Sequence, residues 1–291
     1  MTDAAAMRVL FWNVAVGGDR RLPLLERVDA DLLLLAEVSL SSSRYWTQRW
    51  AGKYDCAAAL ELVDSPQDRP RGAMIASRWP LRAARAISDL PRPERGLVAE
   101  TDHPGGQLSL IAWSAPNAAG DGRAAKQQGY SAVHAELATL QPLVVAGVDT
   151  NTWDDPPLGS PPAELDPDWE PEQTFCGREP AHGLQDALRV VLDRDRPRSD
   201  LVRAVRPHGP LAATYIRRPA GRPTRIINRP GMAFGLDRMD RIYASPTIEV
   251  ADCEAFYHEA IDAGSDHALV LADLRILSDS RRSTARSGLR G

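Results

Sequence analysis

The chain is a succession of short apolar runs, and several of them stop abruptly at a polar side chain. Two such runs, residues 8–14 and 31–37, predict buried strands. Leucine and valine positions at helical spacing between them predict a short helix over residues 22–28. The order strand, helix, strand predicts a parallel pair, which brings Asn13 and Glu37 to the same edge of a sheet.

Later runs predict more strands and two helices. A strand-rich group covers residues 54–63, 72–77, 96–101 and 108–113. Its connections are rich in Pro and Gly and show no clear helical pattern, which favours antiparallel hairpins and meanders. Apolar positions at helical spacing predict helices over residues 122–140 and 183–192. The last predicted strands cover residues 241–245 and 269–277.

The apolar run at residues 143–151 ends in a distinctive way. It passes through Gly147 and finishes with Asp149 and Asn151, two positions apart. Alternate residues of a strand point in the same direction, so these two side chains are expected to project together from the end of a buried strand. Such a pair suits a metal or substrate site. A plain turn is the alternative, because Asp and Asn also favour turns.

Composition narrows the class of protein. The 291 residues include 43% apolar and 25% charged positions, as in soluble globular proteins. No apolar run approaches the ~20 residues of a membrane span, and residues 1–6 lack the features of a signal peptide. Cys56, Cys176 and Cys253 show no metal-binding spacing and suit a reducing, cytoplasmic compartment. The net charge of −4 gives no global attraction to nucleic acid.

No internal repeat or linker divides the chain, so we expect one domain over residues 1–277. The Ser/Arg-rich residues 278–291 predict a disordered tail. Residues 154–179 are acidic and Pro-rich, which favours an irregular surface excursion. Residues 189–229 hold eleven Arg against three Asp. This basic stretch could grip a nucleic-acid backbone, or it could be a solvated surface balanced by the acidic stretch before it.

Several of the predicted apolar strands begin or end at a polar side chain. These side chains are Asn13, Glu37, Asp149 with Asn151, Asp240, and Asp266 with His267. Oxygen ligands of this kind suit a hard cation such as Mg²⁺ or Mn²⁺, which also engages substrate phosphate. His267 could activate or position a water, with a carboxylate to orient it. Each residue alone also has an ordinary structural role as a turn residue, surface charge or ion-pair partner.

In this combination and order the motifs resemble the endonuclease/exonuclease/phosphatase superfamily, which has the DNase I-like fold. The matching pieces are Trp12-Asn13, the strand ending in Glu37, residues 72–78, Gly147-Val148-Asp149-Thr150-Asn151, residues 238–243, and Ser265-Asp266-His267. The resemblance covers roughly residues 7–277. It implies a four-layer α/β sandwich with two packed mixed β-sheets and a site at one end.

The resemblance also implies an activity and residue roles. The activity is that of a divalent-metal-dependent phosphoesterase, most simply a phosphodiesterase or nuclease that uses in-line attack by water. Asn13, Glu37 and Asp266 are expected on the metal side. Asp149 and Asn151 would contact the attacked phosphate or the water, Asp240 would orient His267, and His267 would hold the scissile phosphate or act on the water. Ser114 and Asn117 are expected at the substrate.

Two departures leave alternatives open. Many members have Gln before the metal-binding Glu, where this chain has Ala36. Many also have a His, or an aromatic hydroxyl followed by Pro-Asn, at the position of Ser114. A phosphatase for a small metabolite or lipid headgroup, or a non-catalytic phosphate-binding module, therefore remains an alternative. No basic amphipathic helix favours membranes, and the sequence leaves the oligomeric state open.

Overall fold

A computed structural model describes residues 5–64, 70–152, 170–177, 179–205, 215–216 and 236–277. The predicted tail over residues 278–291 lies outside these ranges, as does most of the predicted acidic excursion. The excursion's last part, described from residue 170, begins with a helix, α5 (Glu170–Cys176). None of the described helices is both long and apolar enough to span a bilayer.

The first sheet combines strands from the two ends of the described chain. Its order is β13-β14-β1-β2-β4-β3. The strands are β1 (Ala5–Val16), β2 (Leu32–Ser39), β3 (Asp55–Ala58), β4 (Arg71–Ser77), β13 (Ile248–Phe256) and β14 (Leu269–Ile276). β1 and β2 are parallel and are joined through α1 (Leu22–Val28), as the sequence predicted, whereas the other pairs are antiparallel.

The second sheet has the order β5-β6-β7-β8-β12-β9. Its strands are β5 (Leu81–Ala86), β6 (Gly96–His103), β7 (Gly106–Ser114), β8 (Val144–Asp149), β9 (Gln185–Asp186) and β12 (Asp240–Ala244). The parallel pair β7 and β8 is connected through α3 (Ala118–Asp121) and α4 (Arg123–Thr139), and the other pairs are antiparallel. A small separate ribbon pairs β10 (Tyr215–Ile216) with β11 (Leu236–Asp237).

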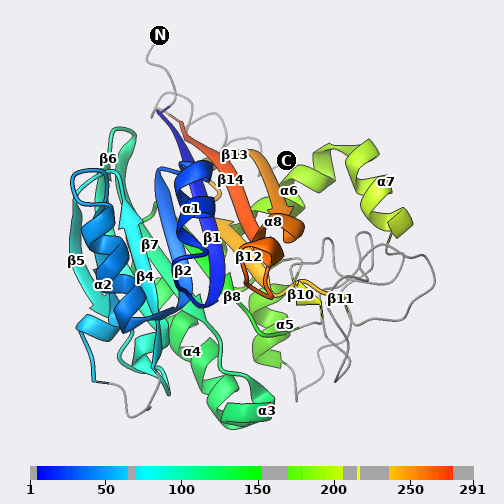
Figure 1. Ribbon diagram of the computed structural model, residues 1–291. Coiled ribbons are helices and arrows are strands. Elements are labelled where there is room, and N and C mark those ends of the chain that lie inside the picture. The colour runs from blue at the N-terminus through cyan, green and yellow to red at the C-terminus, as the bar shows by residue number, and fades with distance from the viewer. Residues whose placement is uncertain are drawn as a thin grey trace.

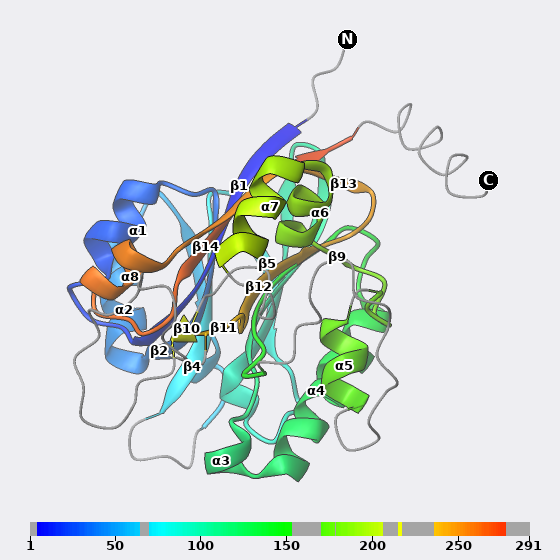
Figure 2. The same ribbon diagram turned by 90° about the vertical axis from the view of Figure 1, so that its right-hand side faces the viewer.

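The two sheets pack face to face and helices cover both outer faces (Figure 1; Figure 2). Alternate residues of β1 serve two cores: Phe11 lies in the core between the sheets, and Trp12 lies in the core under the outer helices. Burial on both faces explains why this strand is a continuous apolar run. The outer helices are α1, α2 (Leu40–Arg49) and α8 (Tyr257–Asp262) on the first sheet, and α4 and α5 on the second. The predicted four-layer sandwich is confirmed.

Near the site the sheets approach closely at Gly147. A Cβ atom on Gly147 would lie 2.4 Å from Cδ2 of Phe11 and 2.8 Å from Cβ of Leu34. Both partners belong to the opposite sheet and are fully buried. The missing side chain therefore sets the sheet spacing beside Asp149.

The structure corrects several predicted bounds. The strand predicted at residues 54–63 ends at Ala58, and a 3₁₀ helix (Ala59–Glu61) follows. The helix predicted at residues 183–192 begins later, as α6 (Ala187–Arg194), because β9 precedes it. A further helix, α7 (Arg196–Val205), and a second 3₁₀ helix (Pro93–Arg95) complete the described elements. The sequence did not predict α2, β5 or β13.

Candidate active site

Strand register brings three predicted residues side by side in the second sheet. Ser114 of β7 pairs with Asp149 of β8, and Asp149 pairs with Asp240 of β12. In the first sheet, Asn13 of β1 pairs with Ala36 of β2, so Glu37 follows directly beside it. The carboxyl ends of both parallel pairs therefore carry the polar residues that the sequence singled out.

Asp149 is the centre of a buried hydrogen-bond network. Its Oδ2 accepts hydrogen bonds from Asn13 Nδ2 at 2.8 Å and from Ser114 Oγ at 3.2 Å. Its Oδ1 accepts one from the backbone N–H of Asn151 at 3.0 Å. The donors come from both sheets, so the Asp149 carboxylate links the two sheets.

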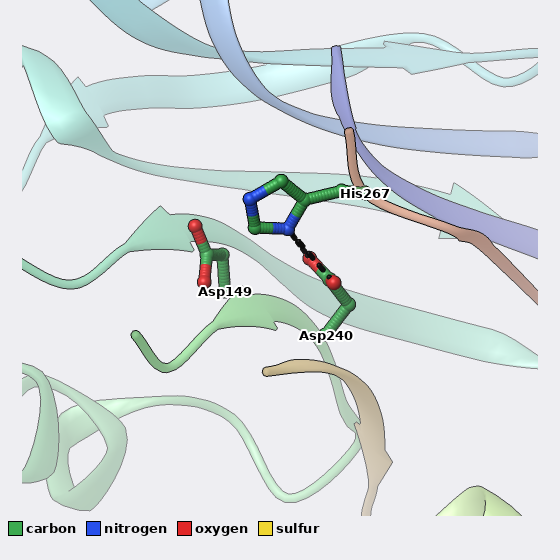
Figure 3. A group of neighbouring side chains, drawn as sticks. All are labelled: Asp149, Asp240 and His267. Atoms are coloured by element: carbon green, nitrogen blue, oxygen red, sulfur yellow. Dashed lines mark hydrogen bonds and ion pairs between the residues drawn. The ribbon is translucent and has the colours of Figure 1, made fainter. Parts of the chain in front are cut away.

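His267 lies in the same buried cluster and is oriented by Asp240. Nδ1 of His267 lies 2.9 Å and 3.0 Å from the two carboxylate oxygens of Asp240 (Figure 3). Trp12 Nε1 donates to the backbone carbonyl of His267 at 3.1 Å, and Ser265 Oγ accepts from its backbone N–H at 3.1 Å. The imidazole is thus fixed through both its side chain and its backbone.

The charges around His267 decide its protonation. Burial opposes the charged form, but the carboxylates of Asp240 and Asp149 outweigh burial and raise the pKa of His267 to about 10. The imidazole is therefore protonated at neutral pH. Its Nδ1–H donates to Asp240, which leaves Nε2–H as a second donor.

Strained backbone marks the ends of the site strands. Ala15, Val16, Glu37 and Asn151 all have positive φ angles, with Val16 at 81°. Such angles are uncommon for residues other than Gly, and they concentrate where function requires a particular geometry. At Asn151 the side chain is also fixed, since Nδ2 donates to the carbonyl of Ala115 at 2.7 Å.

Glu37 has a partner that sequence reasoning missed. Nη1 of Arg71, at the start of β4, lies 2.7 Å from Oε2 of Glu37. The glutamate side chain is 17% exposed and the arginine side chain 45%. The two residues are 34 positions apart and meet across antiparallel strands, so no short-range pattern signals the pair. With Ala36 in place of the family's Gln, Arg71 holds this carboxylate.

Asp266 is half-buried between two residues of the network. Ser265 Oγ donates to the carbonyl of Asn13 at 2.6 Å, and His267 follows directly. Arg21 adds a second attachment, since it donates to the carbonyls of Val14 and Gly264 at 3.1 Å and 2.5 Å. The segment before β14 is therefore held against the end of β1.

Ser114 and Asn117, the two expected substrate contacts, are placed differently. Ser114 is buried and supports Asp149. Asn117 is exposed, and its Oδ1 caps α3 by accepting from the backbone N–H of Ala119 at 2.9 Å. Among the described residues, Asn117 has no hydrogen bond to the buried cluster.

The donor chemistry of the site fits a divalent cation. Glu37 and Asp266 place carboxylates, and Asn13 an amide oxygen, at adjoining strand ends, next to the cluster of Asp149, Asp240 and His267, whose polar atoms lie within 4.8 Å of one another. Mostly oxygen ligands favour Mg²⁺ or Mn²⁺ over softer metals. Two arginines in the described part of the predicted basic stretch are engaged within the fold. Arg194 and Arg198 donate to carbonyls of β13, and Arg198 also pairs with Asp252.

Solved structures share this fold at low sequence identity. An endonuclease/exonuclease/phosphatase from Beutenbergia cavernae matches with a TM-score of 0.60 and 17% identity, over 94% of this chain and 72% of that one. TDP2 of D. rerio complexed with single-strand DNA product matches with a TM-score of 0.60 and 15% identity, over 93% of this chain and 99% of that one. An AP endonuclease from Archaeoglobus fulgidus matches with a TM-score of 0.57 and 19% identity, over 94% of this chain and 99% of that one.

Among curated protein sequences, none matches the chain significantly. The sequence model of the endonuclease/exonuclease/phosphatase family matches residues 10–267, which include every residue of the buried cluster. The chain therefore belongs to the endonuclease/exonuclease/phosphatase family.

Proposed function

We propose that this protein is a divalent-metal-dependent phosphodiesterase that hydrolyses P–O bonds by in-line attack of water. The observation that carries the proposal is the buried convergence of Asp149, Asp240 and His267 at one end of the two sheets. A protonated imidazole beside an ionised carboxylate provides a donor for phosphate oxygen and an acceptor for a water proton.

His267 is the phosphate-binding donor in this proposal. Its raised pKa keeps Nε2–H available at neutral pH, and Asp240 fixes the ring through Nδ1. A positioned cationic donor stabilises the charge that builds up on a nonbridging oxygen as water attacks. The same protonation makes His267 a poor base toward water.

Asp149 then accepts a proton from the attacking water while the bond between phosphorus and the leaving oxygen breaks, and the leaving oxygen takes its proton from solvent water. Its carboxylate is oriented by Asn13 and Ser114, and the side-chain amide of Asn151 lies beside it, with Nδ2 at 3.4 Å from Oδ2. The two amide hydrogens of Asn151 are directed to Ala115 and Asp149, so Asn151 would position Asp149 beside the attacked phosphate.

Glu37, Asn13 and Asp266 would hold the Mg²⁺ or Mn²⁺ ion. When bound, such an ion withdraws negative charge from the phosphoryl group. Arg21 keeps the segment that contains Asp266 in place, and Glu37 is paired with Arg71 in this structure.

Nucleic acid is the substrate class that we propose first. The D. rerio relative is described in complex with single-strand DNA product, and the A. fulgidus relative as an AP endonuclease. Arg194 and Arg198 are engaged by β13 within the fold and give this proposal no support. An assay must therefore decide between a nucleic-acid substrate and a small phosphoester.

The test is hydrolysis of a phosphodiester, a phosphomonoester and single-stranded DNA with Mg²⁺, by wild type and by Glu37→Ala. Loss of this carboxylate should lower the rate about 10²–10⁴-fold. Glu61→Ala is the matched control, since Glu61 pairs with Arg44 outside the site. Equal rates for wild type and Glu37→Ala would refute the proposed site. Faster turnover of the monoester would indicate a phosphatase, and binding without turnover would indicate a non-catalytic module.

A further inference from the structure

A buried ion pair lies behind the reacting cluster and has no role in the proposed chemistry. Lys126 of α4 and Glu172 of α5 are only 2% and 1% exposed. Nζ of Lys126 lies 3.6 Å from Oε1 of Glu172. A buried pair of this kind gives little net stability over apolar residues of the same volume, so its presence calls for another reason.

The ammonium group of Lys126 also contacts the site strand. Nζ donates to the backbone carbonyl of Asn151 at 2.7 Å. One turn further along α4, the hydroxyl of Tyr130 donates to the carbonyl of Thr150 at 2.5 Å. Residues four apart lie on the same face of a helix, so α4 binds two successive carbonyls just beyond the end of β8.

These carbonyls belong to a segment with a demanding conformation. Asn151 has φ of +46°, in the left-handed region. This backbone conformation sets the relative directions of two groups of Asn151. Its backbone N–H bonds Asp149, and its side-chain amide bonds Ala115. A fixed cationic donor on the Asn151 carbonyl stabilises the left-handed peptide against relaxation toward an ordinary turn.

We propose that Lys126, held by Glu172, is a positioning residue that fixes Asn151, and through its backbone N–H Asp149, for reaction. This inference deepens the proposed function, on which its kinetic part rests. Glu172 of α5 attracts the ammonium group by charge at 3.6 Å, without a hydrogen bond, so the outer helix layer contributes to the geometry of the inner site. A misplacement of about 1 Å at a reacting group can cost ~10²-fold in rate, which is the scale of effect that such a contact controls.

The first experiment reads the Asn151 side chain directly. The chain has four asparagines, Asn13, Asn117, Asn151 and Asn228, so selective ¹⁵N-asparagine labelling gives few side-chain amide signals. Asn151→Ala assigns the signal of interest. Lys126→Met with Glu172→Gln removes the donor to Asn151 without leaving either charge buried alone. We expect the Asn151 amide signal to shift or broaden while that of Asn117 stays unchanged.

Lys53 supplies the matched control, because it is the chain's other lysine and pairs with Asp29 at the surface. Lys53→Met should leave the Asn151 signal unchanged. Should the double variant fail to fold, Lys126→Arg replaces it, since the larger guanidinium retains the charge but moves the donor. An unchanged Asn151 signal in the folded variant would overturn the proposal. This readout needs no metal and no substrate, so it stands even if the proposed activity fails.

The second experiment is kinetic. Lys126→Met with Glu172→Gln should lower kcat about 10-fold or more with little change in KM. In an Asn151→Ala background the same pair of substitutions should change kcat less than about 2-fold, because its target is already gone. The same loss in both backgrounds would show a general structural effect and overturn the proposal.

Discussion

Replacing Gly147 by Ala tests whether the close approach of the two sheets supports the site. The added Cβ would meet Cδ2 of Phe11 at 2.4 Å and Cβ of Leu34 at 2.8 Å. Leu34 Cβ is attached to the backbone of a central strand, so it can yield only if β2 moves. Overpacking of this kind costs about 1–3 kcal/mol, and the position of the clash favours the upper end. A loss of about 3 kcal/mol corresponds to a fall in Tm of roughly 6–10 °C for a domain of this size.

The assay is thermal unfolding followed by circular dichroism, with turnover measured well below the Tm of the variant. A wider sheet spacing would also stretch the 2.8 Å bond between Asn13 and Asp149, so the rate should fall in the folded variant. Gly120→Ala is the control, because no atom lies within 4 Å of a Cβ placed there. A Tm for Gly147→Ala equal to that of wild type would refute the packing argument.

Three further substitutions probe the network. Arg71→Gln frees Oε2 of Glu37 and removes a nearby positive charge, so Mg²⁺ measured by calorimetry should bind about 2–5-fold more tightly. Weaker binding would mean that the main role of Arg71 is to orient the Glu37 carboxylate. Asn13→Ala removes a donor to the buried Asp149 carboxylate and should lower the unfolding free energy by about 1.5–3 kcal/mol in urea titration; no change would count against the network. Burial opposes the charged form of His267, but the carboxylates of Asp240 and Asp149 raise its pKa to about 10. The charged imidazole therefore stabilises the fold fully below about pH 6.5, the pKa of an unfolded His, and this contribution is lost as the pH rises toward 10. Between pH 7 and 10 the Tm of wild type should therefore fall more steeply than that of His267→Asn, and parallel curves would contradict the assignment.

Most strands, and the polar residues at their ends, could be predicted from the sequence for one physical reason, whereas the packing of two sheets was implied by the family resemblance. A strand buried on both faces is a continuous apolar run, so a polar residue at its end stands out. Asn13, Asp149 and Asp240 follow this rule, and the structure joins the first two by a hydrogen bond and pairs the last two across strands.

The missed features lack such a signal. The helix α2 begins with a run of serines, and its start depends on Ser39 Oγ accepting from the N–H of Ser42, which mean hydropathy does not reveal. In β13 acidic and small residues interrupt the apolar pattern. The contacts of Arg71 with Glu37 and of Lys126 with Asn151 span 34 and 25 positions, so tertiary register alone decides them.

The order in which the strands are synthesised differs from their order in the first sheet. β14 lies between β13 and β1, and Ala5 pairs with Ile276. His267 lies two residues before β14, so the imidazole joins Asn13 and Asp149 only when this last described strand docks. A nascent chain on the ribosome therefore carries β1 with one unpaired edge and has no complete reaction centre until residues near 276 have emerged. Because β14 is the last described strand of the first sheet along the chain, the cluster around Asp149 is completed only after the other described strands of that sheet have been made.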